Sequence, residues 1–320
     1  MAEIILHHHE RSPFSEKVRL VFGLKGISWR AVEIPAWMPK PDLMPLTGGY
    51  RKTPVMQIGA DIFCDTRIIL RELDRRFSQP ALDRGGGELI AAWADSALFI
   101  NAVGVAFGSL ADSFPKELKE DREKFTGGRF SADRFKAVQP TLRAQYRAQL
   151  VSIEETFADG RDYLIGSSPS AADFAVYHPI WFVRKNVRDP DFLAGCPALA
   201  AWRERMAKFG HGTRTPLDAK EALAIAKTES PAGVSSKSSN DLSGCHVGQQ
   251  VTVAANDYGR DPVAGKLLAI DDAEIIIRRH DPLVGDLNIH FPRVGFDVAA
   301  GSNRCKAATH PSPQCVGPVA

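Results

Sequence analysis

The chain has 320 residues, of which 44% are hydrophobic and 24% are charged, with a formal net charge of +2 at pH 7. This length suits two or three domains, and the near-neutral charge gives no electrostatic argument for nucleic acid, a membrane surface or an acidic partner. The five cysteines show no CxxC or metal-type spacing, which fits a reducing compartment. We find neither a signal peptide nor a run of about 18 apolar residues, so we expect a cytoplasmic protein.

Residues 1–78 begin with strand and helix signals in alternation. Short strands are predicted over residues 3–8 and 29–34. Between them, Ser12 followed by proline is typical of an N-cap and first helical position, and Gly26 is a plausible helix stop. This part of the chain therefore predicts a β-α-β unit.

A proline-rich segment over residues 35–45 excludes long regular structure there. Two strands follow, over residues 55–58 and 62–64, joined by a tight turn. Asp65 or Thr66 then caps a helix. The order β-α-β, loop, β-β-α predicts an α/β domain.

After a linker at residues 79–87, the hydrophobic period is helical for a long way. Apolar stripes such as Leu142, Tyr146 and Leu150 recur, so residues 88–228 are predicted to form an all-helical domain. Residues 229–244 are rich in serine, glycine and proline, which is typical of a flexible linker.

Residues 245–300 change to short β-rich runs and predict a small all-β module, an SH3-like barrel. With five Lys/Arg against eight Asp/Glu, the module is not expected to bind nucleic acid. We expect it to fold independently of residues 1–228, and residues 301–320 to be disordered. The module is then an accessory that docks on the helical domain or binds a partner; the alternative is a lid over the active site that contributes to acceptor binding. Its predicted core consists of Val251, Val253, Leu267, Ile270, Ile275, Ile277 and Ile289.

Three short motifs in the first domain carry the chemistry. They are Ser12-Pro13-Phe14-Ser15 at a helix start, Lys52-Thr53-Pro54 before a strand, and Cys64-Asp65-Thr66 at the next helix start. Taken singly, each has an ordinary alternative: a common helix start, a common turn and a common cap.

At these spacings the motifs resemble the cytosolic glutathione transferase superfamily. The string SPFSEKVRLVFGLKGI is similar to the serine-type classes such as tau, and KTPVMQIGADIFCDTRII looks like the family's cis-proline strand and acidic-hydroxyl pair. Ser170-Ala171-Ala172-Asp173 matches the capping box that this family places in its core helix. The resemblance covers roughly residues 1–228 and implies a thioredoxin-like domain followed by a helical domain.

The resemblance implies that Ser12 is the catalytic residue, because a hydroxyl at a helix start can stabilise a thiolate. It implies glutathione contacts from Phe14, Lys52, Thr53, Pro54 (if cis), Asp65 and Thr66. Asp65 and Thr66 suit the γ-glutamyl end, and Lys52 suits a carboxylate unless it is a solvated surface lysine. Ser15 is the alternative hydroxyl.

Trp93, Phe99 and Phe107 are proposed to line the acceptor pocket, although aromatic residues at this spacing are also typical of a helix core. We expect no metal site, because His7, His8 and His9 alternate faces on a strand. No zinc spacing links Cys245, His246, His280 and His290.

The expected function is transfer of the glutathione thiolate to a small, electrophilic, apolar acceptor, with glutathione as co-substrate and no further cofactor. The alternatives are a glutathione-dependent isomerase or peroxidase, and a non-catalytic glutathione or ligand carrier on the same fold. A thiol-disulfide reductase is disfavoured, because Ser12 occupies the position where such relatives carry cysteine. The resemblance also implies a homodimer, with neither nucleic acid nor membrane as a partner.

Overall fold

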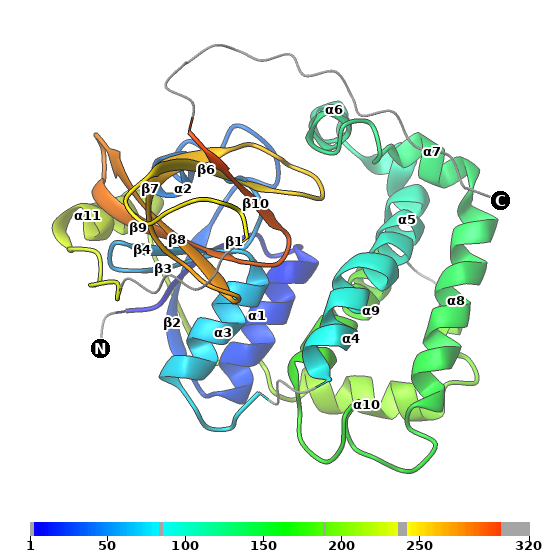
Figure 1. The fold of residues 1–320 in the computed structure, drawn as a ribbon. Helices are drawn as coiled ribbons and strands as arrows, with labels where there is room; N and C mark the ends of the chain where they lie inside the picture. Colours follow the sequence, from blue (N-terminus) through cyan, green and yellow to red (C-terminus); the bar gives the residue numbers. More distant parts are fainter. Residues whose placement is uncertain (1–2, 83–85, 188–189, 236–241, 302–320) are drawn as a thin grey trace.

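The computed structural model describes residues 3–82, 86–187, 190–235 and 242–301. Strands and their covering helices lie on one side of the molecule, and a group of long helices lies on the other (Figure 1). The tail that we expected to be disordered falls almost entirely on residues 302–320, outside the described residues.

The first domain has the predicted order of elements. Its sheet runs β2-β1-β3-β4, with β1 parallel to β2 and antiparallel to β3, and β3 antiparallel to β4. This is the thioredoxin-like arrangement that the sequence predicted. The elements are β1 (Ile5–His8), α1 (Pro13–Leu24), β2 (Ser28–Glu33), α2 (Met44–Thr47), β3 (Val55–Ile58), β4 (Asp61–Cys64) and α3 (Thr66–Arg76).

The helical domain is built around α9, which packs against α1, α4 and α5. The Ser170–Asp173 capping box is present, and Trp202 donates its indole N–H to Asp173 at 2.8 Å. The helices are α4 (Gly87–Trp93), α5 (Phe99–Leu110), α6 (Lys116–Phe125), α7 (Ala132–Ala137), α8 (Gln139–Glu155), α9 (Ala171–Asn186) and α10 (Pro197–Ala207), with a π-helical turn (Ala94–Leu98) and 3₁₀ turns (Ala111–Ser113 and Pro190–Leu193) between them.

The helical run Gly87–Ser113 is, among the described helices, the one long and apolar enough to span a membrane, with a mean hydropathy of 1.6. This test uses length and composition only, and the core helix of a soluble protein passes it too. The run packs against α7, α8 and α9, as a core helix does, but only 39% of its apolar window is buried. The run is therefore weak evidence for a membrane segment. Part of its apolar surface is exposed.

The prediction that residues 88–228 are entirely helical was wrong at one point. β5 (Thr213–Pro216) pairs in parallel with β2, so the chain returns to the first domain's sheet before α11 (Ala219–Thr228). All four residues of β5 are exposed. Because the strand is held by backbone pairing and buries no side chain, it leaves no hydrophobic pattern in the sequence.

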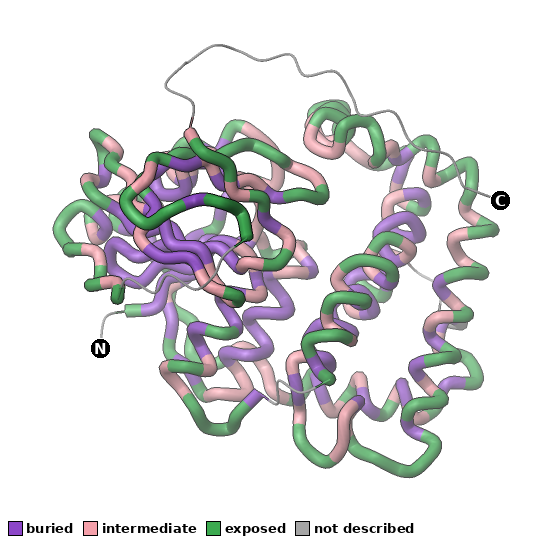
Figure 2. The backbone as a smooth tube through the Cα atoms, in the orientation of Figure 1, coloured by how far each residue is buried: buried purple, intermediate pink, exposed green. Residues whose placement is uncertain are grey.

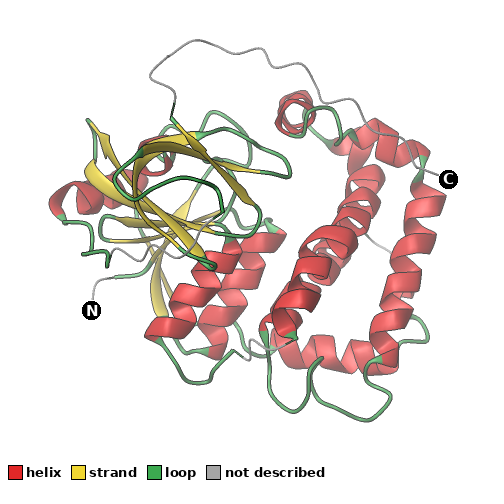
Figure 3. Ribbon diagram, viewed as in Figure 1, coloured by secondary structure: helices red, strands yellow, loops and turns green. Residues whose placement is uncertain are grey.

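The C-terminal module is all-β, as predicted. Its strands, drawn as yellow arrows in Figure 3, run in the order β10-β6-β7-β8-β9, each antiparallel to its neighbour. The seven predicted core residues are all buried. Figure 2 shows the buried stretches along the backbone. The strands are β6 (Gln250–Ala255), β7 (Val263–Ile270), β8 (Glu274–Asp281), β9 (Gly285–Pro292) and β10 (Phe296–Ala300).

The module is not separate from the first domain, although the linker composition led us to expect a separate unit. β9 pairs in parallel with β4, so that all ten strands form one sheet, and one hydrophobic core joins Ile5 and Ile62 to Ile277 and Ile289. The start of the predicted flexible linker is also fixed, because the Ala232 N–H donates to Asp61 at 2.9 Å. Composition alone does not show that the edge strand β4 is covered in this way.

Candidate functional site

The register of the sheet brings the three predicted motifs to one place. Val55 at the start of β3 pairs with His7 near the end of β1 on one side and with Cys64 at the end of β4 on the other. The Ser-Pro helix start follows β1, the Thr-Pro pair precedes β3, and the Asp-Thr helix start follows β4. All three motifs therefore lie at the same end of the sheet.

Ser12 is the N-cap of α1. It has extended backbone angles, and its Oγ accepts the N–H of Ser15 at 3.2 Å. This contact uses a lone pair of Oγ, so the hydroxyl hydrogen can be donated to an anion in front of the helix. Ser15 is fully buried, and its own Oγ has no partner among the described residues. The choice of Ser12 over Ser15 stays a prediction.

The Thr53–Pro54 peptide bond is cis, as the resemblance implied. Beside it lies Lys40, which the sequence analysis missed. Its Nζ donates to Thr53 Oγ1 and to the carbonyl of Arg51, each at 3.0 Å. Burial, helped by Arg122 and Arg51, lowers the pKa of Lys40 to about 7. The residue stands in the proline-rich loop, where no motif marks it.

Asp65 caps α3 by accepting the N–H of Arg67 at 2.9 Å. Among the described residues it is the one non-glycine residue with a positive φ, +94°. Such backbone conformations cost roughly 1–3 kcal/mol and cluster at binding sites. Burial raises the pKa of the Asp65 carboxyl, against the opposing charges of Lys52 and Lys17.

Thr66 is buried, and its Oγ1 accepts a hydrogen bond from Lys17 at 3.2 Å. The same ammonium pairs with Asp95 at 2.6 Å, and His178 lies 2.9 Å from the other oxygen of that carboxylate. Burial opposes ionisation of Asp95, but Lys17 and His178 outweigh it and lower its pKa to about 2. Asp95 lies in the π-helical turn, which the sequence pattern did not predict.

The predicted aromatic residues are not all in one place. The ring of Phe14 lies 4.7 Å from Phe99 and 4.6 Å from His178, so Phe14 packs at the boundary with the helical domain. Trp93 is 37% exposed and is not one of the side chains of the apolar cluster that contains Phe99. Phe14 and Phe99 are thus brought together, whereas Trp93 has no supported place in an acceptor pocket.

Phe107 belongs to a second aromatic group two turns further along α5. Its ring centroid lies 4.6 Å from those of both Phe114 and Phe130, and the three rings line a small pocket with Arg122 of α6. Phe107 and Phe99 pack against the same small apolar cluster. The cavity is small, and Lys119 also lines it, so the place of Phe107 in an acceptor pocket stays a prediction.

Lys52 is close to Thr53 in sequence but is held by the β module. Its Nζ donates to Asp257 at 2.5 Å and lies 4.2 Å from the ring centroid of Tyr258. Neither Asp257 nor Tyr258 was predicted, because strand patterns do not show where a connecting loop lies.

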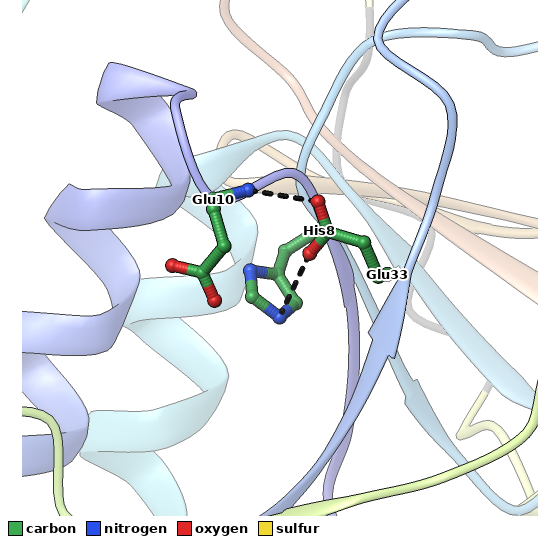
Figure 4. Close-up of side chains that lie close together, drawn as sticks. All are labelled: His8, Glu10 and Glu33. Atoms are coloured by element: carbon green, nitrogen blue, oxygen red, sulfur yellow. Dashed lines mark hydrogen bonds and ion pairs between the residues drawn. The ribbon is translucent and has the colours of Figure 1, made fainter.

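A separate group of side chains, His8, Glu10 and Glu33, has metal-type ligand atoms within 4.8 Å of one another (Figure 4). Arg19 lies 3.1 Å from Nδ1 of His8, and since a guanidinium only donates, that nitrogen accepts and Nε2 carries the hydrogen. Burial and Arg19 lower the pKa of His8 to about 3, and Glu10 is paired with Arg214. This arrangement does not favour a cation, and the predicted absence of a metal site stays a prediction.

Comparison with known proteins gives the family. The model of the glutathione S-transferase N-terminal domain matches residues 6–81, and that of the C-terminal domain matches residues 79–205. A solved structure of a GST-like protein from Pseudomonas syringae is 38% identical, covers 94% of this chain and 100% of its own, and has a TM-score of 0.74. That coverage extends past residue 205 and includes most of the β module.

More distant structures share the fold. They include a glutathione S-transferase from Rhodospirillum rubrum F11 (18% identity, 64% of this chain and 87% of the other, TM-score 0.51) and FzlA from C. crescentus (22% identity, 69% and 92%, TM-score 0.51). A search of curated proteins gave no match. The two domain matches and the relative that aligns over nearly the whole chain establish that this chain belongs to the glutathione S-transferase superfamily.

Proposed function

We propose that the protein binds glutathione and transfers its thiolate to a small, electrophilic, apolar acceptor. The observation that carries this proposal is the position of the Ser12 hydroxyl: it caps α1 at the end of the sheet where Thr53–Pro54 and Asp65–Thr66 also lie. Family membership supports glutathione as the ligand.

The chemistry needs a modest change in acidity. An ordinary thiol with a pKa near 8.5 is only about 3% ionised at pH 7, and lowering that pKa by roughly two units requires about 2.7 kcal/mol. A hydroxyl hydrogen bond to an anion contributes roughly 1.5–3 kcal/mol, and a helix N-terminus contributes about 1–2 kcal/mol more. Ser12 and α1 together supply a stabilisation of this size. The nucleophile is the sulfur of the ligand, so Ser12 forms no covalent bond.

The other residues are suited to different parts of the glutathione molecule. The N-terminus of α3, with Asp65 and Thr66, suits the γ-glutamyl end, because backbone N–H groups bind its carboxylate and Asp65 attracts its ammonium group. Thr53 offers its backbone to the middle of the peptide. Lys40 and Lys52 are the cations available for the second carboxylate. No cofactor is needed for this chemistry.

A homodimer in the cytoplasm is part of the proposal. Leu89 and Trp93 are 78% and 37% exposed and lie one turn apart on α4, and Ile100, at the start of α5, is 63% exposed. Exposed apolar side chains of this kind are typical of an interaction site. Sedimentation of the wild-type chain and of Ile100→Glu tests it: a dimer that dissociates in the variant supports the proposal.

The direct test of function has two steps. Calorimetry measures binding of glutathione, and turnover of a chloronitrobenzene acceptor then measures transfer. Binding with turnover supports a transferase. Binding without turnover of any electrophile supports the non-catalytic carrier, which is favoured by one observation: the aromatic side chains near the site are largely packed against one another.

A further inference from the structure

The loop between β6 and β7 connects the β module to both other parts of the molecule. The N–H of Gly259 donates to the carbonyl of Phe125, at the end of α6, at 3.0 Å. The ring of Tyr258 meets the ring of Phe125 edge-on at 5.3 Å. Gly259 has a φ of +59°, and a Cβ there would lie 2.1 Å from the Phe125 ring, so the close approach requires glycine. The loop is thus fixed against the helical domain.

The same loop reaches the site through Lys52. Asp257 accepts a hydrogen bond from the ammonium group of Lys52 at 2.5 Å. The ring centroid of Tyr258 lies 4.2 Å from the same nitrogen, within the range of a cation–π contact. The side chain of Lys52 is 14% exposed, whereas that of Asp257 is 53% exposed. The ammonium group is therefore enclosed, and its carboxylate partner faces solvent.

Burial raises the pKa of the Tyr258 phenol, and the carboxylates of Asp257 and Asp65 act in the same direction. The Tyr258 ring lies over the ammonium group of Lys52, the residue that precedes the cis Thr53–Pro54 pair. The β module, which lies outside the two transferase domains, therefore contacts a residue next to the candidate glutathione site.

We propose that the Asn256–Arg260 loop is a latch on this site, in which Asp257 and a carboxylate of the ligand compete for Lys52. This inference rests on the proposed binding of glutathione. The exchange is feasible because an ion pair with one solvent-exposed partner contributes little stability, so a second carboxylate can replace Asp257 at small cost. The Tyr258 ring stays over the ammonium group in either state.

The first experiment measures glutathione affinity of the full-length wild-type protein and of Asp257→Asn by calorimetry. Removal of the internal competitor is expected to tighten binding about two- to fivefold, the effect of one partly exposed ion pair. Asp272→Asn is the matched control: it removes the same charge from an exposed residue in the turn after β7, at the opposite end of that strand. Its affinity should equal that of the wild type.

A second measurement follows the loop itself. Amide hydrogen exchange over residues 256–260 should be faster with glutathione bound than without it, because the ligand takes Lys52 from Asp257. Unchanged or weaker binding in Asp257→Asn, in a wild type that binds glutathione, would overturn the latch and leave the proposed function standing. Binding to neither protein would refute both, and binding only to Asp257→Asn would support a latch that is closed in the wild type.

Discussion

Asp65 meets two demands at one position. It caps α3 with a side-chain oxygen, and it places a partly buried carboxyl group beside the candidate site in a backbone conformation that few residues other than glycine and asparagine adopt. A cap needs only the oxygen, whereas an ammonium group of a ligand needs the charge. The two roles are therefore separable by a single substitution.

Asp65→Asn keeps the capping oxygen and removes the charge. We expect glutathione affinity to fall by about 1.5–3 kcal/mol, since the ligand's ammonium group loses a charged partner, while the free energy of unfolding changes by less than about 1 kcal/mol. Asp218→Asn is the control, because Asp218 caps α11 in the same way by accepting the N–H of Lys220 at 2.8 Å. Equal glutathione affinity in both variants would reduce Asp65 to a helix cap.

Lys40 predicts a pH dependence of binding. Its pKa is about 7, so the side chain is protonated below that pH and neutral above it. If its cation holds a ligand carboxylate, affinity falls as the pH rises, by about fivefold from pH 7 to pH 8 on the fraction protonated in the free protein. S-methylglutathione is the probe, since it has no thiol to titrate. Lys40→Met should bind S-methylglutathione more weakly at pH 6, and its affinity should no longer fall as the pH rises. The same pH dependence in the variant would show that Lys40 does not bind the ligand carboxylate.

At the scale of elements, the junction between β4 and β9 has polar side chains on either side of the Ile62–Ile289 pair. His290 lies 3.1 Å from Asp61 and 2.7 Å from Glu274, and Asn288 donates to Asp61 at 2.9 Å. Burial disfavours the charged imidazole, but the two carboxylates outweigh it and raise the pKa of His290. The strand pairing that joins the module to the first domain is thus supported by a buried imidazole between two carboxylates, which favour its protonated form.

This arrangement sets a sign for stability against pH. Because the folded pKa of His290 lies above its unfolded value of 6.5, its contribution is fully present below about pH 6.5 and is lost as the pH rises through the folded pKa. Urea unfolding across this window should show the wild type losing stability relative to His290→Gln. A stability difference that does not vary with pH would show that the imidazole is uncharged in the fold.

The elements also show what a sequence can and cannot reveal. The helix starts at Ser12 and Asp65 were predictable, because capping residues and a following helical period are local signals. β5 and the π-helical turn were not, since the first buries no side chain and the second depends on packing against α9. Lys40 and Tyr258 stand in loops, and which loops meet at a site is decided by tertiary contacts.

At the scale of the whole molecule, the ten-stranded sheet changes the expected role of the C-terminal module. Local alternation predicted its strands and its core, but strand pairing between β4 and β9 joins residues more than 200 apart in sequence and leaves no local trace. The sequence-based expectation of independent folding rested on linker composition, which does not report on the sheet edge.

Removal of the module is therefore expected to be damaging. A chain that ends at residue 228 exposes the edge of β4 and one side of the shared core, where Ile289, Leu287 and Phe291 are fully buried. Each such side chain contributes roughly 1.5–3 kcal/mol, against a typical net stability of 5–15 kcal/mol. Expression, circular dichroism and urea unfolding should show an aggregated or non-cooperative protein. A soluble, cooperatively folding truncation would restore the view of the module as a detachable accessory.

We propose that the molecule activates the thiol of glutathione through Ser12, and the pKa of the bound thiol tests this most directly. Ultraviolet thiolate absorbance, titrated against pH for glutathione bound to the wild type and to Ser12→Ala, measures it. We predict that the pKa of bound glutathione lies below that of the free thiol and rises by about one unit or more in Ser12→Ala, with turnover slowed about tenfold and affinity changed much less. An unchanged thiol pKa, with undiminished turnover at neutral pH, would contradict the account.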